Sequence, residues 1–158
     1  MEIYARAIQI LLDHAQTQAG PELQTICERA RTHRPIAWDF SILGAESVGG
    51  KAEAAVPAVG ALTCAHMALI LIDDLLDEDP RGLHNQLGSG RTTNLASALF
   101  GLGLAVVLQS NIPQRQRSAA ALSELILRTA YGQDLDVQNP RTEEAYWAVT
   151  KAKSSPYF

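Results

Sequence analysis

The sequence has little positive charge and few cysteines. Its 158 residues carry 13 lysines and arginines against 17 aspartates and glutamates, a formal net charge of −4. No segment gathers basic residues of the kind that follow a nucleic-acid backbone, so no nucleic-acid partner is expected. The two cysteines, Cys27 and Cys64, lack CxxC or metal-site spacing. Reduced thiols in a cytoplasmic protein are therefore expected.

The sequence also lacks a recognisable signal peptide and a long apolar run. The N-terminal segment MEIYARAIQILLDHAQ carries polar residues every few positions, unlike a signal peptide. The longest apolar stretch, residues 95–108, is shorter than the roughly 20 residues that span a bilayer, so a buried core helix and no membrane span are expected there. With 47% hydrophobic residues, the chain is predicted to form one compact domain over residues 1–158.

Apolar residues recur at spacings of three and four along most of the chain, and strand-like alternation is too short to compete. This pattern predicts an all-α protein, divided into segments by proline and glycine. We expect helices at 2–18, 21–33, 35–46, 52–79, 92–110, 113–138 and 142–153. In the fourth of these, positions 57–72 are apolar almost all round, which places that helix in the middle of a bundle.

The predicted central helix ends in a run of carboxylates within the stretch LIDDLLDEDPRG. Asp73, Asp74 and Asp77 are spaced so that they crowd one end of one helix face. They repel one another, and the negative end of the helix dipole disfavours each by about 0.3–1 kcal/mol. A solvated acidic cap is the usual explanation of such a cluster. Because the helix is apolar up to Asp73, a site for a hard cation, Mg²⁺, at the mouth of the bundle is favoured here.

This stretch resembles a motif of a known enzyme family. DDLLD is similar to the first aspartate-rich motif, DDxxD, of the trans-isoprenyl diphosphate synthases, the polyprenyl synthetase family, and the segment that runs into it, GGKAEAAVPAVGALTCAHMALILIDDLLDED, is similar over its whole length. The resemblance implies that Asp73, Asp74 and Asp77 are catalytic, with Asp73 and Asp77 as metal ligands. It also implies that His66, seven residues earlier, contacts isopentenyl diphosphate.

Two arginine-containing stretches fit the same family in the same order. RARTHRPI resembles GKRxRP, and this implies that Arg31 and Arg34 bind one diphosphate with their guanidinium groups. RGLHNQLG resembles RRGxPTxHxxxG, which gives Arg81 as a contact of the allylic diphosphate. Pro80 stands where the family has a second arginine, and Thr32 where it has another.

Two further motifs follow. YGQDLDVQ is similar to GQxLDL and gives Gln133 and Asp136, while KAKSSPYF resembles KTxxLF. In the latter, Lys153 would be catalytic by holding the allylic diphosphate, Ser154 is the hydroxyl residue and Phe158 the closing aromatic. The resemblance implies that Gln133 and Ser154 bind substrate. The resemblance begins near residue 28 and covers only the first part of the family's pattern, since the second DDxxD motif does not occur in this sequence. The chain is expected to be a fragment or a natural short form.

The resemblance implies an orthogonal or antiparallel helix bundle of the isoprenoid synthase type, here incomplete. Members of the family join an allylic diphosphate head-to-tail to isopentenyl diphosphate with Mg²⁺, giving a linear prenyl diphosphate. Cations would hold the diphosphates at the mouth of the bundle, and the apolar interior would hold the growing hydrocarbon. A homodimer is expected, with the apolar helix at 94–110 either at the interface or in the core.

Product length in this family depends on residues four, five and eight positions before the first aspartate. Here these are Leu69, Ala68 and Ala65, and the lack of an aromatic side chain favours products of about C20 or longer. Two alternatives stay open: a terpene synthase on the same scaffold, and a non-catalytic partner subunit of a heteromeric prenyl synthase. Retention of the first-motif aspartates and Lys153 opposes the subunit hypothesis, and the missing second motif favours it.

Overall fold

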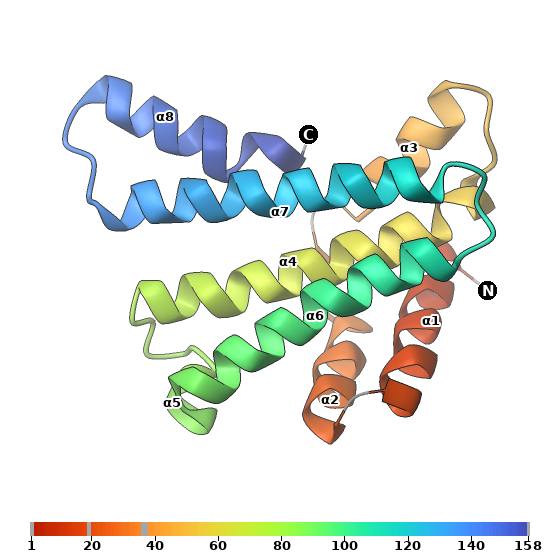
Figure 1. The fold of residues 1–158 in the computed structure, drawn as a ribbon, viewed down its shortest axis with the longest axis horizontal. Coiled ribbons are helices and arrows are strands. Elements are labelled where there is room, and N and C mark those ends of the chain that lie inside the picture. Colours follow the sequence, from red (N-terminus) through yellow and green to blue (C-terminus); the bar gives the residue numbers. More distant parts are fainter. Residues whose placement is uncertain (1, 19, 36–37, 158) are drawn as a thin grey trace.

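A computed structural model describes residues 2–18, 20–35 and 38–157, and these ranges contain helices and no strand (Figure 1). The all-α prediction is confirmed. The helices are α1 (Ile3–Gln18), α2 (Pro21–Ala30), α3 (Phe40–Ser47), α4 (Val56–Leu76), α5 (His84–Leu87), α6 (Ser89–Gln109), α7 (Arg115–Val137) and α8 (Glu143–Lys153), with 3₁₀ turns η1 (Ala52–Ala55) and η2 (Ser155–Tyr157). The long helices α4, α6 and α7 are stacked side by side, α8 returns along α7, and α1 and α2 run across α4 and α6.

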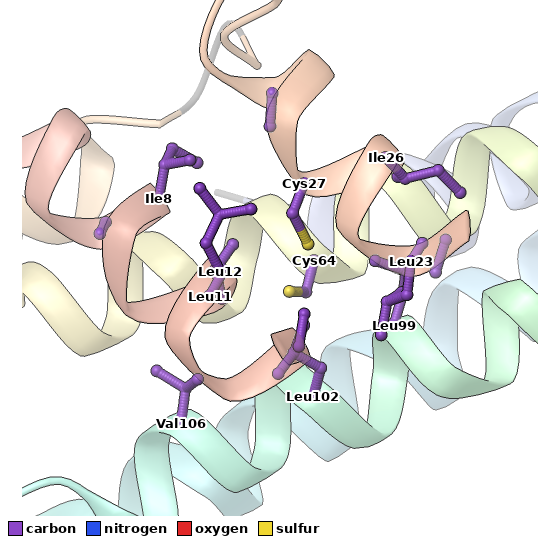
Figure 2. Close-up of a cluster of buried hydrophobic side chains, with 14 of the residues drawn as sticks. Ile8, Leu11, Leu12, Leu23, Ile26, Cys27, Cys64, Leu99, Leu102 and Val106 are labelled. Carbon is purple, nitrogen blue, oxygen red and sulfur yellow. The ribbon is translucent and has the colours of Figure 1, made fainter. Parts of the chain in front are cut away.

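Helix α4 is the centre of the bundle, because its sequence is apolar on nearly every side. One side of α4 joins α1, α2 and α6 in a cluster that we call the α1/α2 core, part of which is shown in Figure 2. Its other side joins α6 and α7 in a second cluster, the α7 core. Both helix thiols, Cys27 and Cys64, are buried in the α1/α2 core. Burial raises the pKa of Cys27 to about 11, so this thiol is protonated at neutral pH.

The acidic end of α4 differs from the prediction that a helix continues to residue 79. The helix ends at Leu76, with Asp77 as its C-cap. Glu78 follows with φ +52°, the left-handed conformation that terminates many helices, and the amide of Asp79 donates to the carbonyl oxygen of Asp74 at 2.8 Å. The chain therefore reverses, and Asp79 lies on a loop instead of the helix.

Three other predicted boundaries shift. The helix expected at 35–46 is α3, Phe40–Ser47, and the one expected at 21–33 stops at Ala30. The hydroxyl of Thr32 donates to the carbonyl oxygen of Arg29 at 3.1 Å, which caps α2 early. Helix α6 begins at Ser89, directly after Gly88, whose φ is +81°. The short α5 was not predicted.

By length and composition alone, two helices could cross a membrane, Ala52–Leu76 and Ser89–Gln109. The apolar stretch 95–108, expected to be too short, thus belongs to a helix that is long enough. In the bundle, 67% of the most apolar window of the first helix and 39% of that of the second are buried. Core helices of soluble proteins meet the same criterion, so this is weak support for a membrane span.

Candidate functional site

Lys153 connects the acidic end of α4 to α7. Its Nζ lies 2.7 Å from Oδ1 of Asp73 and 2.6 Å from Oδ2 of Asp136. Gln133 donates its side-chain amide to the carbonyl oxygen of Leu69 at 3.2 Å, and the same nitrogen lies 3.4 Å from Oδ1 of Asp73. Burial opposes the charged ammonium, but hydrogen bonds to Asp136 and Asp73 outweigh it, so the pKa of Lys153 is raised. The motif residues of α4, α7 and α8 thus form one polar network.

Gly132 allows α8 to come this close to α7. A Cβ atom at this position would lie 2.2 Å from the backbone nitrogen of Lys153 and 2.5 Å from its Cα. Backbone atoms cannot rotate away as a flexible side chain can. The missing side chain of Gly132 therefore sets the distance between the two helices, and with it the position of the ammonium group beside Asp73.

The remaining carboxylates of the cluster have different environments. Asp77 is exposed at the helix end. Asp74 is partly buried, and burial together with the charges of Asp79 and Asp73 raises the pKa of its carboxyl group. Asp79 accepts hydrogen bonds from the backbone amide (2.8 Å), Nε (3.1 Å) and Nη2 (2.8 Å) of Arg81. These bonds lower the pKa of Asp79 to about 2.

A cavity of about 660 Å³ lies beside this acidic end, between α2, α4 and the loop that carries Arg81. Its lining combines an apolar floor with charged and imidazole groups: Ile26, Arg29, Ala30, His33, Arg34, Pro35, His66, Met67, Ile70, Leu71, Asp74, Arg81, Leu83 and Gln86. The structure thus brings together His66, Arg34 and Arg81, three predicted substrate contacts that are far apart in the sequence. Burial lowers the pKa of His66, which favours the neutral imidazole.

The two arginines of the RARTHRPI motif are separated. Arg34 lines the cavity, where Glu2 binds its Nη1 at 2.5 Å and its Nη2 at 2.9 Å. The guanidinium also lies over the rings of Tyr4 and Trp38, at 5.0 and 5.4 Å. Arg31 is not among the lining residues.

Arg31 instead points to other partners. Its Nε lies 2.7 Å from Glu28, and its Nη2 donates to Gln9 at 3.1 Å. The expectation that Arg31 and Arg34 face one diphosphate therefore does not agree with this geometry. Ser154 is the exposed C-cap of α8 and is not among the lining residues. Phe158 lies outside the described residues.

The three residues expected to control product length do not share one environment. Ala65 and Leu69 belong to the α7 core, whereas Ala68 belongs to the α1/α2 core. Further along the α7 core, a second cavity of about 370 Å³ opens between α3, α4, α6 and α7, lined on α4 by Ala58, Ala61 and Leu62. Since Ala61, Ala65 and Leu69 are spaced by four, one face of α4 leads from the acidic end to this cavity, about 18 Å at 1.5 Å per residue.

The acidic end suits Mg²⁺ in donor type. In the described ranges, no group of three or more histidine, cysteine, aspartate or glutamate side chains is arranged to hold a metal ion. Mg²⁺ usually takes one or two protein carboxylates and completes its shell with waters and substrate phosphates. Asp73 and Asp77 could supply these two. Burial first, and then the charges of Asp79 and Asp73, raise the pKa of Asp74, and a cation nearby would favour its charged form.

Comparison of the whole chain with solved structures identifies its architecture. It superposes on a geranylgeranyl pyrophosphate synthetase from the archaeon Geoglobus acetivorans with a TM-score of 0.74 at 18% identity, and on a polyprenyl synthetase from Streptomyces coelicolor A3(2) with a TM-score of 0.81 at 20% identity. The chain has the isoprenoid synthase fold. The superpositions cover 96% and 98% of this chain but 54% and 52% of the other two, so it spans about half their length. No protein-family profile and no curated protein matches the sequence.

Two features of this site were not predicted from the sequence. Arg29 lines the cavity, and Asp79 binds Arg81. The first could have been found from helix periodicity, since Arg29 follows Ile26 by three residues on one face of α2. The second depends on the reversal at Glu78, for which the sequence gives no signal.

Proposed function

We propose that this chain is a magnesium-dependent prenyltransferase, or the part of one that holds its first aspartate-rich motif. The reaction is the head-to-tail condensation of an allylic diphosphate with isopentenyl diphosphate, giving a linear prenyl diphosphate of about C20 or longer. The two structures of the same fold are named as synthetases of geranylgeranyl pyrophosphate and of polyprenyl compounds. We further propose a cytoplasmic location, a single incomplete domain over residues 1–158, and a homodimer.

The observation that carries this proposal is the combination of two sites at one end of α4. Asp73 lies with Lys153 on one side, with Asp77 exposed at the helix end, and a cavity with Arg34, His66 and Arg81 lies on the other. A reaction between two diphosphates needs two such anion-binding regions, joined to an apolar space for hydrocarbon. We assign that space to the second cavity, of about 370 Å³, which lies beyond the buried side chains of Ala65 and Leu69 on the same face of α4.

Each group has a separate role in the proposed reaction. Asp73 and Asp77 would hold Mg²⁺, which neutralises the charge that develops on the diphosphate leaving group. Lys153 would move from Asp73 and Asp136 to the phosphate oxygens of the allylic substrate. Arg34 and the neutral His66 would bind the diphosphate of isopentenyl diphosphate and orient its double bond. Arg81, which the resemblance gives to the allylic diphosphate, lines the same cavity and would contact that substrate from this side.

The test is incubation of the purified chain with Mg²⁺, isopentenyl diphosphate and farnesyl or geranyl diphosphate, followed by analysis of the extracted products. Elongated diphosphates are expected, and Asp73→Asn should abolish them. The fold of that variant is checked by its urea midpoint. Cyclic hydrocarbons would show a terpene synthase instead. If the folded chain gives no product under any of these conditions, the proposal that it is an active enzyme alone is wrong.

A non-catalytic partner subunit is the second candidate, and one observation favours it. The described residues form no complete metal-binding group, and two of the cavity's arginines are already bound by carboxylates. A subunit of this kind would give no product alone but would restore activity to an incomplete prenyl synthase. Mixing the chain with such a synthase and measuring elongation distinguishes the two functions.

A further inference from the structure

Internal carboxylates already neutralise two of the three arginines that line the 660 Å³ cavity. Glu2 binds both terminal nitrogens of Arg34, and Asp79 binds Nε and Nη2 of Arg81. Each pair is bidentate, the geometry that a phosphate group would also use. A diphosphate that enters the cavity must therefore displace a carboxylate before either guanidinium can bind it fully.

Arg29 is the arginine of this lining that is not bound in this way. Among the described residues it has no carboxylate within ion-pair distance, and its side chain is exposed. It lies in the last turn of α2, on the same face as Ile26, which also lines the cavity, as does His33 in the turn after the helix. Arg31, two residues further along, is about 200° around the helix and faces Glu28 and Gln9.

We propose that Arg29 is the cation that anchors the diphosphate in this cavity, in the role that the motif resemblance gives to Arg31. The inference rests on the proposed function, because that function supplies the diphosphate. The C-terminal end of α2 repels an anion through the helix dipole, so its backbone cannot provide the binding. The planar guanidinium of Arg29 can form two parallel hydrogen bonds to phosphate oxygens and loses only water in doing so.

The test uses inorganic pyrophosphate as the probe, titrated into the whole chain in a calorimeter at low salt. Arg29→Ala should weaken binding by about tenfold or more, and Arg29→Lys, which keeps the charge without the planar fork, by less. Arg117→Ala removes an exposed arginine of α7 that is not among the lining residues and serves as the charge-matched control. Urea midpoints of all variants show whether the fold is kept.

Arg31→Ala decides between the two assignments. The inference predicts a change of less than about twofold, the effect of one screened surface charge. It is overturned if Arg31→Ala weakens pyrophosphate binding more than Arg29→Ala does, or if the wild-type chain binds no pyrophosphate.

Its failure can be told apart from failure of the proposed function. Binding that depends on Arg29 in a chain that makes no product supports the inference and refutes the active enzyme. Elongation with a KM for isopentenyl diphosphate that is independent of Arg29 supports the enzyme and refutes the inference.

Discussion

Replacing Gly132 by alanine should destabilise the protein, although alanine is the better helix former. The propensity gain in a helix interior is about 1 kcal/mol. Against it stands a Cβ 2.2 Å from the nitrogen and 2.5 Å from the Cα of Lys153, far inside normal contact distance. Relieving this overlap moves α8 away from α7, and overpacking of this kind costs about 1–3 kcal/mol. With the ion pairs of Lys153 also weakened, we expect a net loss of about 2 kcal/mol.

Gly101 provides the matched control within the same molecule. It lies inside α6, is exposed, and has nothing within 4 Å of the position of a Cβ atom. Gly101→Ala should therefore stabilise the protein by about 0.5–1 kcal/mol. In urea titrations with an m value of about 2 kcal/mol/M, the midpoint should fall by about 1 M for Gly132→Ala and rise by about 0.4 M for Gly101→Ala. If both variants shift the midpoint upward, the close approach of α8 to Gly132 is wrong.

Three further predictions concern the surroundings of the site. Ala68→Phe should destabilise by about 1–3 kcal/mol by overpacking the α1/α2 core, whereas Ala58→Phe faces the 370 Å³ cavity and should change stability by less than about 1 kcal/mol; equal losses in urea would refute this placement. Burial lowers the pKa of His66 below 6.5, so the unfolded chain takes up this proton first as the pH falls and stability decreases below about pH 6.5. His66→Asn should make the urea midpoints at about pH 5 and about pH 8 more alike, and an unchanged difference would show that His66 is not responsible. A double-mutant cycle of Lys153→Met and Asp136→Asn should give a coupling energy of about 1 kcal/mol or more, and additive losses would mean that the 2.6 Å contact contributes nothing.

The sequence predicts the polar network better than it predicts the cavity. Helical periodicity identifies α4 as the buried centre, and the motifs select Asp73, Gln133 and Lys153, which the structure places within hydrogen-bonding distance. Asp73 and Gln133 are on the long helices α4 and α7, so their faces follow from the 3.6-residue repeat, and the close approach of α8 at Gly132 brings Lys153 to them. Arg31 is different, because it directly follows the ten-residue helix α2. A motif match there gives the position of the residue in the sequence, but not the direction in which its side chain points around the helix axis.

Asp79 shows a limit of another kind. Helical continuation to residue 79 is the natural reading of an unbroken acidic run, and glutamate rarely adopts positive φ. The reversal at Glu78 nevertheless removes Asp79 from the helix end and gives it to Arg81. It also reduces the number of carboxylates stacked against the negative end of the helix dipole. The positive φ of Glu78 is thus consistent with a gain in electrostatic free energy, which depends on contacts that form only in the folded chain.

The same cations stabilise the fold and would serve the proposed reaction. Lys153 offsets the repulsion between the carboxylates of α4 and α7 by binding Asp73 and Asp136. Arg81 neutralises the carboxylate of Asp79 in the same way. A diphosphate that binds Lys153 or Arg81 leaves the carboxylates of that residue without a neutralising charge. An added divalent cation would neutralise them again. Metal and diphosphate should therefore bind with positive coupling, since each removes the electrostatic penalty that the other creates. At such a site a diphosphate binds by replacing a carboxylate as the partner of an arginine or lysine. Arg29 is the one lining arginine in the described ranges that a diphosphate can bind without displacing a carboxylate.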